Sequence, residues 1–355
     1  MLLSILFLGV LMSLARRALA WHRPLMLFAA AMSVLAVVSA VGTAADDRLL
    51  DGVPIWFKPL KFSVSFALYC ATLAWMLSLL TRGRRTGWWA GTVVAATSAI
   101  EMAIIVLQVV RGKRSHFNNE TPFDRALFDA MGATVAVLWL GALVIAVLLF
   151  RSSAIDRAAA WAVRLGAVLA LVGAGLGFLM VMPTPEQTAA AERGVARVIG
   201  AHSVGVPDGG PTMPLTGWSA TGGDLRIPHF VGMHALQALP LLLLVLLALA
   251  SRFPRLRHES VRLRLVLVGA GVYTAVLGLV TWQALRGQSL VRPDGLTLAV
   301  AAAVVVAGCA GVGFALRTPP ARNPAPASVR PPSPRRAPAE PDREPGRQSD
   351  REPVA

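Results

Sequence analysis

Four of the six histidines in this sequence lie in or near two polar stretches, where long apolar segments begin or end. They are His116, His202, His229 and His234, and the two stretches cover residues 115–124 and 217–237. Imidazole is the side chain best suited to proton transfer and metal ligation near neutral pH. The sequence has no HExxH, CxxC, Walker or nucleophile-elbow motif that would define one reaction. The histidines therefore indicate a polar site without specifying its chemistry.

A single carboxylate, Glu101, lies in the middle of the apolar segment from about residue 88 to residue 110. At about 1.5 Å per helical residue, it lies roughly 14 Å from the end of that segment. A carboxylate at this depth is costly unless it is neutral, paired or facing water. Gln108, seven residues later, occupies the same helix face. Two interpretations remain open: a proton or cation site, or a protonated carboxyl that only hydrogen-bonds a neighbouring helix.

Lys58 and Lys61 are one helical turn apart at the start of the apolar segment 57–80, and they are two of only three lysines in the chain. They could neutralise Glu101 or bind an anionic group. The alternative is that both side chains extend to the membrane interface without binding anything.

His229 and His234 lie at the start of the apolar segment 228–250. Five residues turn roughly 140° around a helix, so the two histidines do not share a face as an i, i+4 ligand pair would. His234 and Gln237, three residues apart, do share one. His234 is therefore the better candidate for a proton relay or a single ligand, and a helix-packing hydrogen bond is the alternative.

The loop after the segment 88–110 contains His116, a candidate for the rim of the same site. Asp124 is predicted to cap the helix that follows this loop, with Thr121 as a turn residue. His202 falls in a longer loop and is predicted to have no role in the site.

Eight apolar runs are long enough to cross a hydrocarbon core about 30 Å thick, which needs roughly 20 helical residues. They cover about 24–43, 57–80, 88–110, 126–150, 158–182, 228–250, 262–285 and 295–316. Hydrophobic residues make up 55% of the chain and charged residues only 15%, which excludes an ordinary soluble domain. Gly173 and Gly175 lie inside the fifth run and predict close helix packing rather than a dinucleotide loop. The predicted fold is an all-α, polytopic transmembrane helix bundle.

The net charge of +15 comes from basic residues on one predicted side of the membrane. Membrane topology explains this excess, so no nucleic-acid partner is predicted. With the N-terminus inside, the inner segments hold 22 of the 34 Lys and Arg but only seven of the 19 acids. The positive-inside rule then places the N-terminus and the tail in the cytoplasm and the protein in the cell membrane. The loop 111–125, predicted outside, opposes this orientation with four basic residues.

The chain divides into four predicted regions. Residues 1–23 form an apolar, interfacial segment, and a ninth span is the alternative. Residues 24–150 and 151–316 form two four-helix halves, the second with a long outer loop at 183–227. Residues 317–355, with 11 prolines and eight arginines, form a disordered cytoplasmic tail.

A short internal repeat supports this division. Gln108, Arg111 and Gly112 match Gln283, Arg286 and Gly287, 175 residues later and at corresponding helix ends. Parallel repeats of this kind occur in transporters. The alternative is that Gln, Arg and Gly are simply common interface residues.

Three functions remain open beside the role of a purely structural membrane subunit. The first is binding or transport of a small polar or anionic solute, or of protons, through an outer-half polar site. The second is a haem-binding redox or haem-handling protein, because the layout resembles that of haem A synthases, which have eight helices in two parallel halves with histidines near the outer face. However, the second, fourth and eighth segments contain no histidine, so no haem ligand is assigned. The third is a lipid-modifying enzyme with His116 or His229 as base.

The predicted partners are the lipid bilayer and a small molecule or ion, and the sequence predicts neither a metal site nor a cofactor other than the haem of the second hypothesis. The predicted ligand-binding residues are Lys58, Lys61, Glu101, Gln108, His116, His229, His234 and Gln237.

Overall fold

The computed structural model describes residues 18–50, 52–152 and 156–317. Within these ranges, eight helices are long and apolar enough to cross a membrane. They are α2 (Arg23–Ala45), α3 (Phe57–Ser78), α4 (Arg84–Val110), α5 (Pro122–Arg151), α6 (Arg157–Leu176), α8 (Arg226–Leu249), α9 (Glu259–Leu285) and α10 (Gly295–Arg317). The prediction of an all-α bundle of eight spans is confirmed, and the chain is a multi-pass membrane protein.

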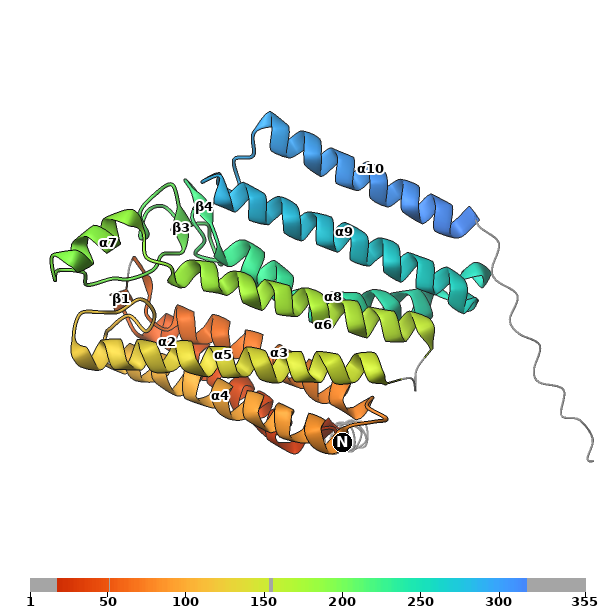
Figure 1. Ribbon diagram of the computed structural model, residues 1–355, viewed down its shortest axis with the longest axis horizontal. Coiled ribbons are helices and arrows are strands. Elements are labelled where there is room, and N and C mark those ends of the chain that lie inside the picture. Colours follow the sequence, from red (N-terminus) through yellow and green to blue (C-terminus); the bar gives the residue numbers. More distant parts are fainter. Residues whose placement is uncertain (1–17, 51, 153–155, 318–355) are drawn as a thin grey trace, which may run out of the picture. The chain divides into compact units, whose positions relative to one another are not determined.

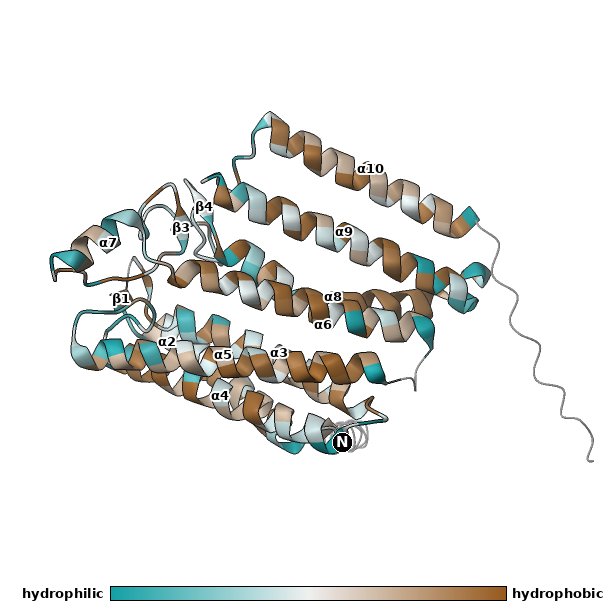
Figure 2. Cartoon of the chain, in the orientation of Figure 1, coloured by the Kyte–Doolittle hydropathy of each residue, from teal (hydrophilic) through white to brown (hydrophobic). Residues whose placement is uncertain are grey.

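The helix surfaces are as apolar as lipid requires. Figure 2 shows hydrophobic residues along the length of the eight helices and hydrophilic residues mainly at their ends. In α10 only Thr297 and Ala315 are buried, and large residues such as Val306 and Phe314 are exposed. A continuous exposed apolar surface is unfavourable in water but not in a bilayer. These surfaces are therefore explained by contact with lipid chains.

The long helices pack as neighbours in two groups (Figure 1). In the first group α2 packs against α3 and α4 against α5, and α3 also contacts α4. In the second group α6 packs along α8, both contact α9, and α9 carries α10. The contacts between the groups join α5 to α6 and α3 to α8. That the groups are parallel halves of one repeat stays a prediction.

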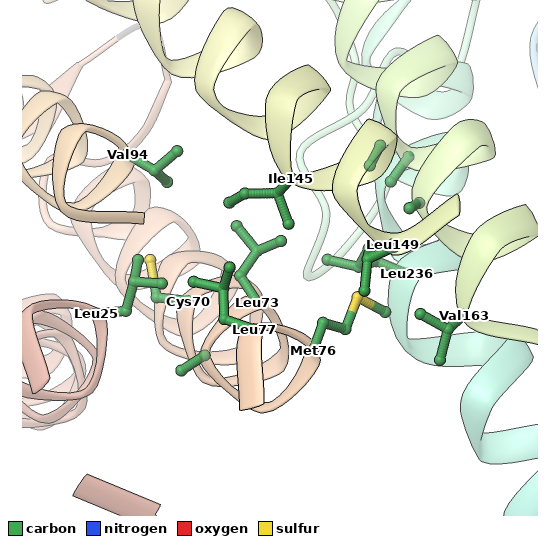
Figure 3. Packing of buried hydrophobic residues seen from close by; sticks show 14 of the residues in the cluster. Leu25, Cys70, Leu73, Met76, Leu77, Val94, Ile145, Leu149, Val163 and Leu236 are labelled. Atoms are coloured by element: carbon green, nitrogen blue, oxygen red, sulfur yellow. The ribbon is translucent and has the colours of Figure 1, made fainter. Parts of the chain in front are cut away.

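The largest hydrophobic core lies mainly within the first group and extends to α6 and α8 of the second. It includes Leu25 of α2, Met76 of α3, Ile145 of α5 and Leu236 of α8, each at most 1% exposed (Figure 3). Because lipid is as apolar as these side chains, the core stabilises the bundle by close packing rather than by removing apolar surface from water.

Two glycines set the distance between α6 and α8. A Cβ atom at Gly173 would lie 2.4 Å from the Gly232 backbone, and one at Gly232 would lie 2.3 Å from the Gly173 Cα, both much closer than van der Waals contact. Absence of side chains therefore lets the two helix backbones touch, as in other membrane helix pairs. The prediction that Gly173 serves close helix packing is confirmed.

We call the end of the bundle that carries the segments 111–121, 182–225 and 286–294 the loop end. It holds α7 (Pro185–Glu192) and two short antiparallel strand pairs, β1 (Leu49–Leu50) with β2 (Val53–Pro54) and β3 (Ser203–Val204) with β4 (Gly223–Asp224). A 3₁₀ turn, η1 (Gly177–Val181), extends α6 into this end, and η2 (Pro254–Arg257) lies at the other end. The predicted N-terminal segment, apart from residues 18–23, and the predicted tail, apart from Arg317, lie outside the described residues.

Candidate functional site

Lys58, His116 and Glu101 lie in direct succession, from the loop end toward the interior of the bundle. Lys58 Nζ is 3.0 Å from His116 Nδ1, and His116 Nε2 is 3.5 Å from Glu101 Oε1. An ammonium group only donates hydrogen bonds, so Nδ1 accepts and the ring proton lies on Nε2, facing the carboxylate. The imidazole thus connects a cation on α3 with a carboxylate on α4. We call these three residues the relay.

The interior beside α2, α3 and α4 contains polar atoms that the protein leaves unpaired. Glu101 is 2% exposed, and its Oε2 has no hydrogen-bond partner among the described residues. The buried hydroxyl groups of Ser39 on α2 and Ser63 on α3 also lack a partner in the described part of the chain. From the helix lengths, all three residues lie roughly 9–14 Å from the loop end. Buried polar oxygens of this kind are where water or a small ligand binds.

The loop that carries His116 is held on two sides. The backbone N–H of Ile199, in the long loop, donates to the carbonyl of Phe117. The Phe62 ring lies 5.8 Å from the His116 ring on another side. Phe117 has a φ of 62°, in the left-handed region that bulky residues rarely adopt. Such strain persists only where the surrounding contacts fix the backbone, so the imidazole is held in place.

Burial lowers the pKa of His116 well below its ordinary value, and the positive charge of Lys58 acts in the same direction. His202 and His229 are also close enough to lower it. The imidazole is therefore neutral at physiological pH, the state in which it can accept a proton on one nitrogen and release one from the other.

His202, for which the sequence predicted no role, lies near the relay. Its ring is 4.8 Å from that of Phe117, and its Nδ1 is 3.1 Å from Asp208 Oδ2. Burial lowers the pKa of His202, and Asp208 only partly offsets this effect. Burial alone would raise the pKa of Asp208, but hydrogen bonds from His202 and Ser203 hold it well below its usual range.

We expect the protein to lose stability as the pH falls below about 6.5, the ordinary histidine pKa. A folded-state pKa below that value means that the unfolded chain binds protons that folded His116 and His202 do not bind, so stability is highest above pH 6.5. Each histidine contributes a slope of at most about 1.4 kcal/mol per pH unit. Asp208 adds a further loss only below its ordinary value of 3.8.

Thermal unfolding of the detergent-solubilised protein, followed by tryptophan fluorescence between pH 8 and pH 5, measures this slope. The His202→Gln variant should unfold with a shallower pH dependence than the parent. His258→Gln removes a histidine at the opposite end of the bundle and should leave the slope unchanged. A parent protein with equal stability across this range would contradict the prediction.

Gln108 does not contact the relay. Its Nε2 donates to Asp124 Oδ1 at 3.0 Å, and Arg111 donates to both side chains at 2.6 Å. The prediction that Asp124 caps α5 is wrong, because Thr121 is the N-cap and accepts from the Asp124 N–H. The Asp124 carboxylate lies in the first turn of α5, where it binds Gln108 and Arg111. This buried network fixes the corner between α4 and α5.

The corner between α9 and α10 shares the Arg–Asp pair and the helix ending, although Gln283 donates to the Ser289 carbonyl rather than to the aspartate. Arg286 donates to Asp294 at 2.6 Å, as Arg111 donates to Asp124. Gly287 has a φ of 70° and Gly112 a φ of 69°. In both corners the residue after the glycine donates its N–H to the carbonyl of the glutamine five residues earlier. This is the Schellman pattern of helix ends, and it explains the glycine in the Gln-x-x-Arg-Gly match.

The predicted residues of α8 lie in two separate places. His229 donates from Nδ1 to the carbonyl of Gly173 on α6, at 2.9 Å. His234 Nδ1 is 3.3 Å from Gln237 Oε1, which agrees with their shared helix face. Gln237 Nε2 in turn donates to Thr72 on α3, at 3.3 Å. His234 and Gln237 therefore contribute to the contact between the two helix groups.

Lys61 lies apart from the relay, against the long loop. Its Nζ donates to the carbonyl of Thr216 at 2.8 Å and lies 4.6 Å from the centre of the Phe57 ring. Within the described residues it forms no ion pair. The buried carboxylate of Asp224 is instead paired with Arg226.

The structure thus brings Lys58, His116 and Glu101 together and separates Gln108, Lys61, His234 and Gln237 from them. His229 is near enough to affect His116, but its Nδ1 is bonded to the Gly173 carbonyl. Sequence reasoning missed His202, Asp208, Thr72 and the Asp224–Arg226 pair, whose partners all depend on how the loops fold. Comparison with protein-family models, curated proteins and solved structures finds no match for the chain. Its class is therefore defined by its fold as that of a multi-pass helical membrane protein.

Proposed function

We propose that the protein binds protons, and passes them between the loop end and the membrane interior, through the relay of Lys58, His116 and Glu101. The observation that carries this proposal is the continuous contact from Lys58 Nζ through both ring nitrogens of His116 to Glu101 Oε1. Ionisable groups inside membrane segments are costly and mark ion and proton pathways. A lysine and a glutamate that served only as a structural ion pair would contact each other directly and would not need a neutral imidazole between them.

The proposed proton transfer has two coupled parts. The Lys58 ammonium gives a proton to Nδ1 of His116, and the proton on Nε2 passes to Glu101. The products are a neutral lysine, a neutral carboxylic acid and the other imidazole tautomer. The total charge of the relay does not change, because one cation and one anion disappear together. Lys58 then regains a proton from the loop end, and the neutral carboxyl is the form that a membrane interior tolerates.

Proton flux into liposomes tests the proposal. The purified protein is reconstituted with a pH-sensitive dye inside, and a potassium diffusion potential drives protons inward. We expect the Glu101→Gln variant, which keeps the shape of the side chain but cannot ionise, to lose about 100-fold of the flux. His116→Gln should lose a similar fraction, because an amide cannot exchange protons between two nitrogens.

The matched control is Glu120→Gln. Glu120 is partly exposed and pairs with Lys113 at 2.6 Å, outside the relay, so its loss should leave the flux unchanged. Infrared spectroscopy gives a second readout, because protonated Glu101 should produce a carboxylic-acid carbonyl band that disappears in Glu101→Gln. A folded Glu101→Gln protein with parental flux and an unchanged infrared spectrum would sink the proposal.

No observation favours the haem-handling or lipid-modifying alternatives over the proton relay. Nδ1 of His229 is already bonded to the Gly173 carbonyl, and His234 binds Gln237. Both alternatives stay predictions, as does transport of a small polar solute together with the proton.

We also propose that the two helix groups derive from one repeated unit. The equivalent Gln–Arg–Gly corners, each with an aspartate at the start of the following helix, support this proposal. A repeat of this kind places corresponding helices in the same orientation, as in transporters with parallel halves.

A further inference from the structure

The loop end contains a second candidate site, separate from the relay, in a cavity of ≈ 240 Å³. Its lining is mostly apolar and comes from α2, β2, α3 and the long loop: Thr43, Pro54, Phe57, Met213, Leu215 and Gly217. Leu215 is 86% exposed, so the cavity opens to the surroundings at this residue. Typical sites for drug-sized ligands have roughly 300–1,000 Å³, so a smaller ligand fits here.

A lysine lies directly behind the wall of this cavity. Lys61 packs against the Phe57 ring, and a Cβ atom at Gly217 would lie 3.5 Å from Lys61 Nζ. Phe57 and Gly217 both line the cavity, so the ammonium group contacts two of its lining residues from behind. Lys61 has three N–H donors, and Thr216 O is the one hydrogen-bond acceptor it has within the described residues.

The rim of the cavity is held in an uncommon conformation. Leu215 has a φ of 65°, and the Thr216 N–H donates to the Pro214 carbonyl two residues earlier. This is a γ-turn with positive φ, which is rare and strained for a leucine. Strained residues persist where the surrounding structure fixes them, and they cluster at ligand-binding positions.

We propose that the cavity binds a small amphiphilic monoanion, a carboxylate on a short hydrocarbon chain, with its head group on Lys61. The apolar lining contacts the chain, and the half-buried ammonium supplies the matching charge. Thr43 and Phe57 lie near the loop ends of α2 and α3, where a membrane interface would lie. An amphiphile dissolved in the bilayer surface therefore reaches the opening directly.

Lysine labelling of the full-length protein tests this proposal with an internal control. The chain has only three lysines, Lys58, Lys61 and Lys113. The protein is placed in nanodiscs of zwitterionic lipid and treated with a water-soluble acylating reagent, and each lysine is quantified by peptide mass spectrometry. Decanoate should slow labelling of Lys61 but not of Lys113. Decanol and acetate, which lack the charge and the chain respectively, should not slow it.

Direct binding of radiolabelled decanoate is then compared between the parent protein and its lysine variants. Lys61→Met keeps the length of the side chain without its charge and should weaken binding about tenfold or more. Lys113→Met, which removes a partly exposed lysine paired with Glu120, should bind like the parent. Glu101→Gln should also bind decanoate normally, so failure of the relay and failure of this site are distinguishable.

Three outcomes would overturn the proposal. They are labelling of Lys61 that decanoate does not change, equal protection by decanol, and equal decanoate affinity in the parent and Lys61→Met proteins. Nanodiscs with anionic lipid form a further arm. If they protect Lys61 fully without decanoate, the occupant is a lipid head group and the assignment of a free carboxylate is wrong.

Discussion

Replacing Asp224 by asparagine is expected to loosen the long loop and to lower the stability of the folded protein by about 3–5 kcal/mol, the cost of breaking a buried ion pair. Asp224 is fully buried, and Arg226 donates to both of its oxygens at 2.6 and 2.9 Å. It also accepts from the N–H of Ser219 at 2.7 Å. Loss of the carboxylate charge leaves Arg226 without its ionic partner. It also weakens the contact that holds the turn at Ser219.

Limited trypsin digestion and thermal unfolding measure the two effects. The loop arginines Arg193 and Arg197 should become faster cleavage sites in Asp224→Asn, and the melting temperature should fall. Asp129→Asn is the matched control. Asp129 pairs with Arg125 one helix turn away, and both side chains are exposed, so this change should cost almost nothing. Parental cleavage rates in Asp224→Asn would mean that other contacts hold the loop.

Replacing Gly173 by alanine is expected to separate α6 from α8. The added methyl group would meet the backbone of Gly232, which cannot move away as a flexible side chain can. The same shift would break the hydrogen bond from His229 to the Gly173 carbonyl. Overpacking of this kind costs about 1–3 kcal/mol or more of folding free energy. The contact that it disrupts, between α6 and α8, is the largest helix contact of the second group.

Gly278→Ala on α9 is the control for the Gly173 variant. A Cβ atom at Gly278 meets nothing within 4 Å, so this change should be neutral or slightly stabilising through helix propensity. Thermal unfolding of both variants in the same detergent gives the comparison. If Gly173→Ala and Gly278→Ala unfold at the same temperature, the helix backbones are free to move apart without cost.

The sequence predicts the spans well because lipid imposes a simple rule on composition. The largest difference is at the end of the fifth run, predicted near residue 182, because α6 ends at Leu176 and η1 continues it to Val181. At helix starts, α4 begins at Arg84 rather than near residue 88, and α5 begins at Pro122 rather than near residue 126. Charged residues at these starts lower the local hydropathy, although a helix end at the interface tolerates them. Capping and corner contacts, not hydropathy, decide where such helices begin.

The candidate site was predictable only in part. The position of Glu101 deep inside an apolar run is enough to single it out, because that position can be read from the local sequence alone. Its partners are not predictable in this way, because His116 reaches it through a loop held by a second loop. Gln108 shows the limit most clearly. It shares a helix face with Glu101, yet its side chain binds Asp124, a partner that only the packing of α5 against α4 supplies.

The two Gln–Arg–Gly corners also bear on stoichiometry. The offset that aligns Gln108 with Gln283 aligns Glu101 with Val276, a residue of α9 that is 37% exposed. Under the proposed duplication, therefore, the second copy has no carboxylate at the position that corresponds to Glu101. Infrared spectroscopy should detect one carboxyl group per chain that takes up a proton in the membrane interior, and not two.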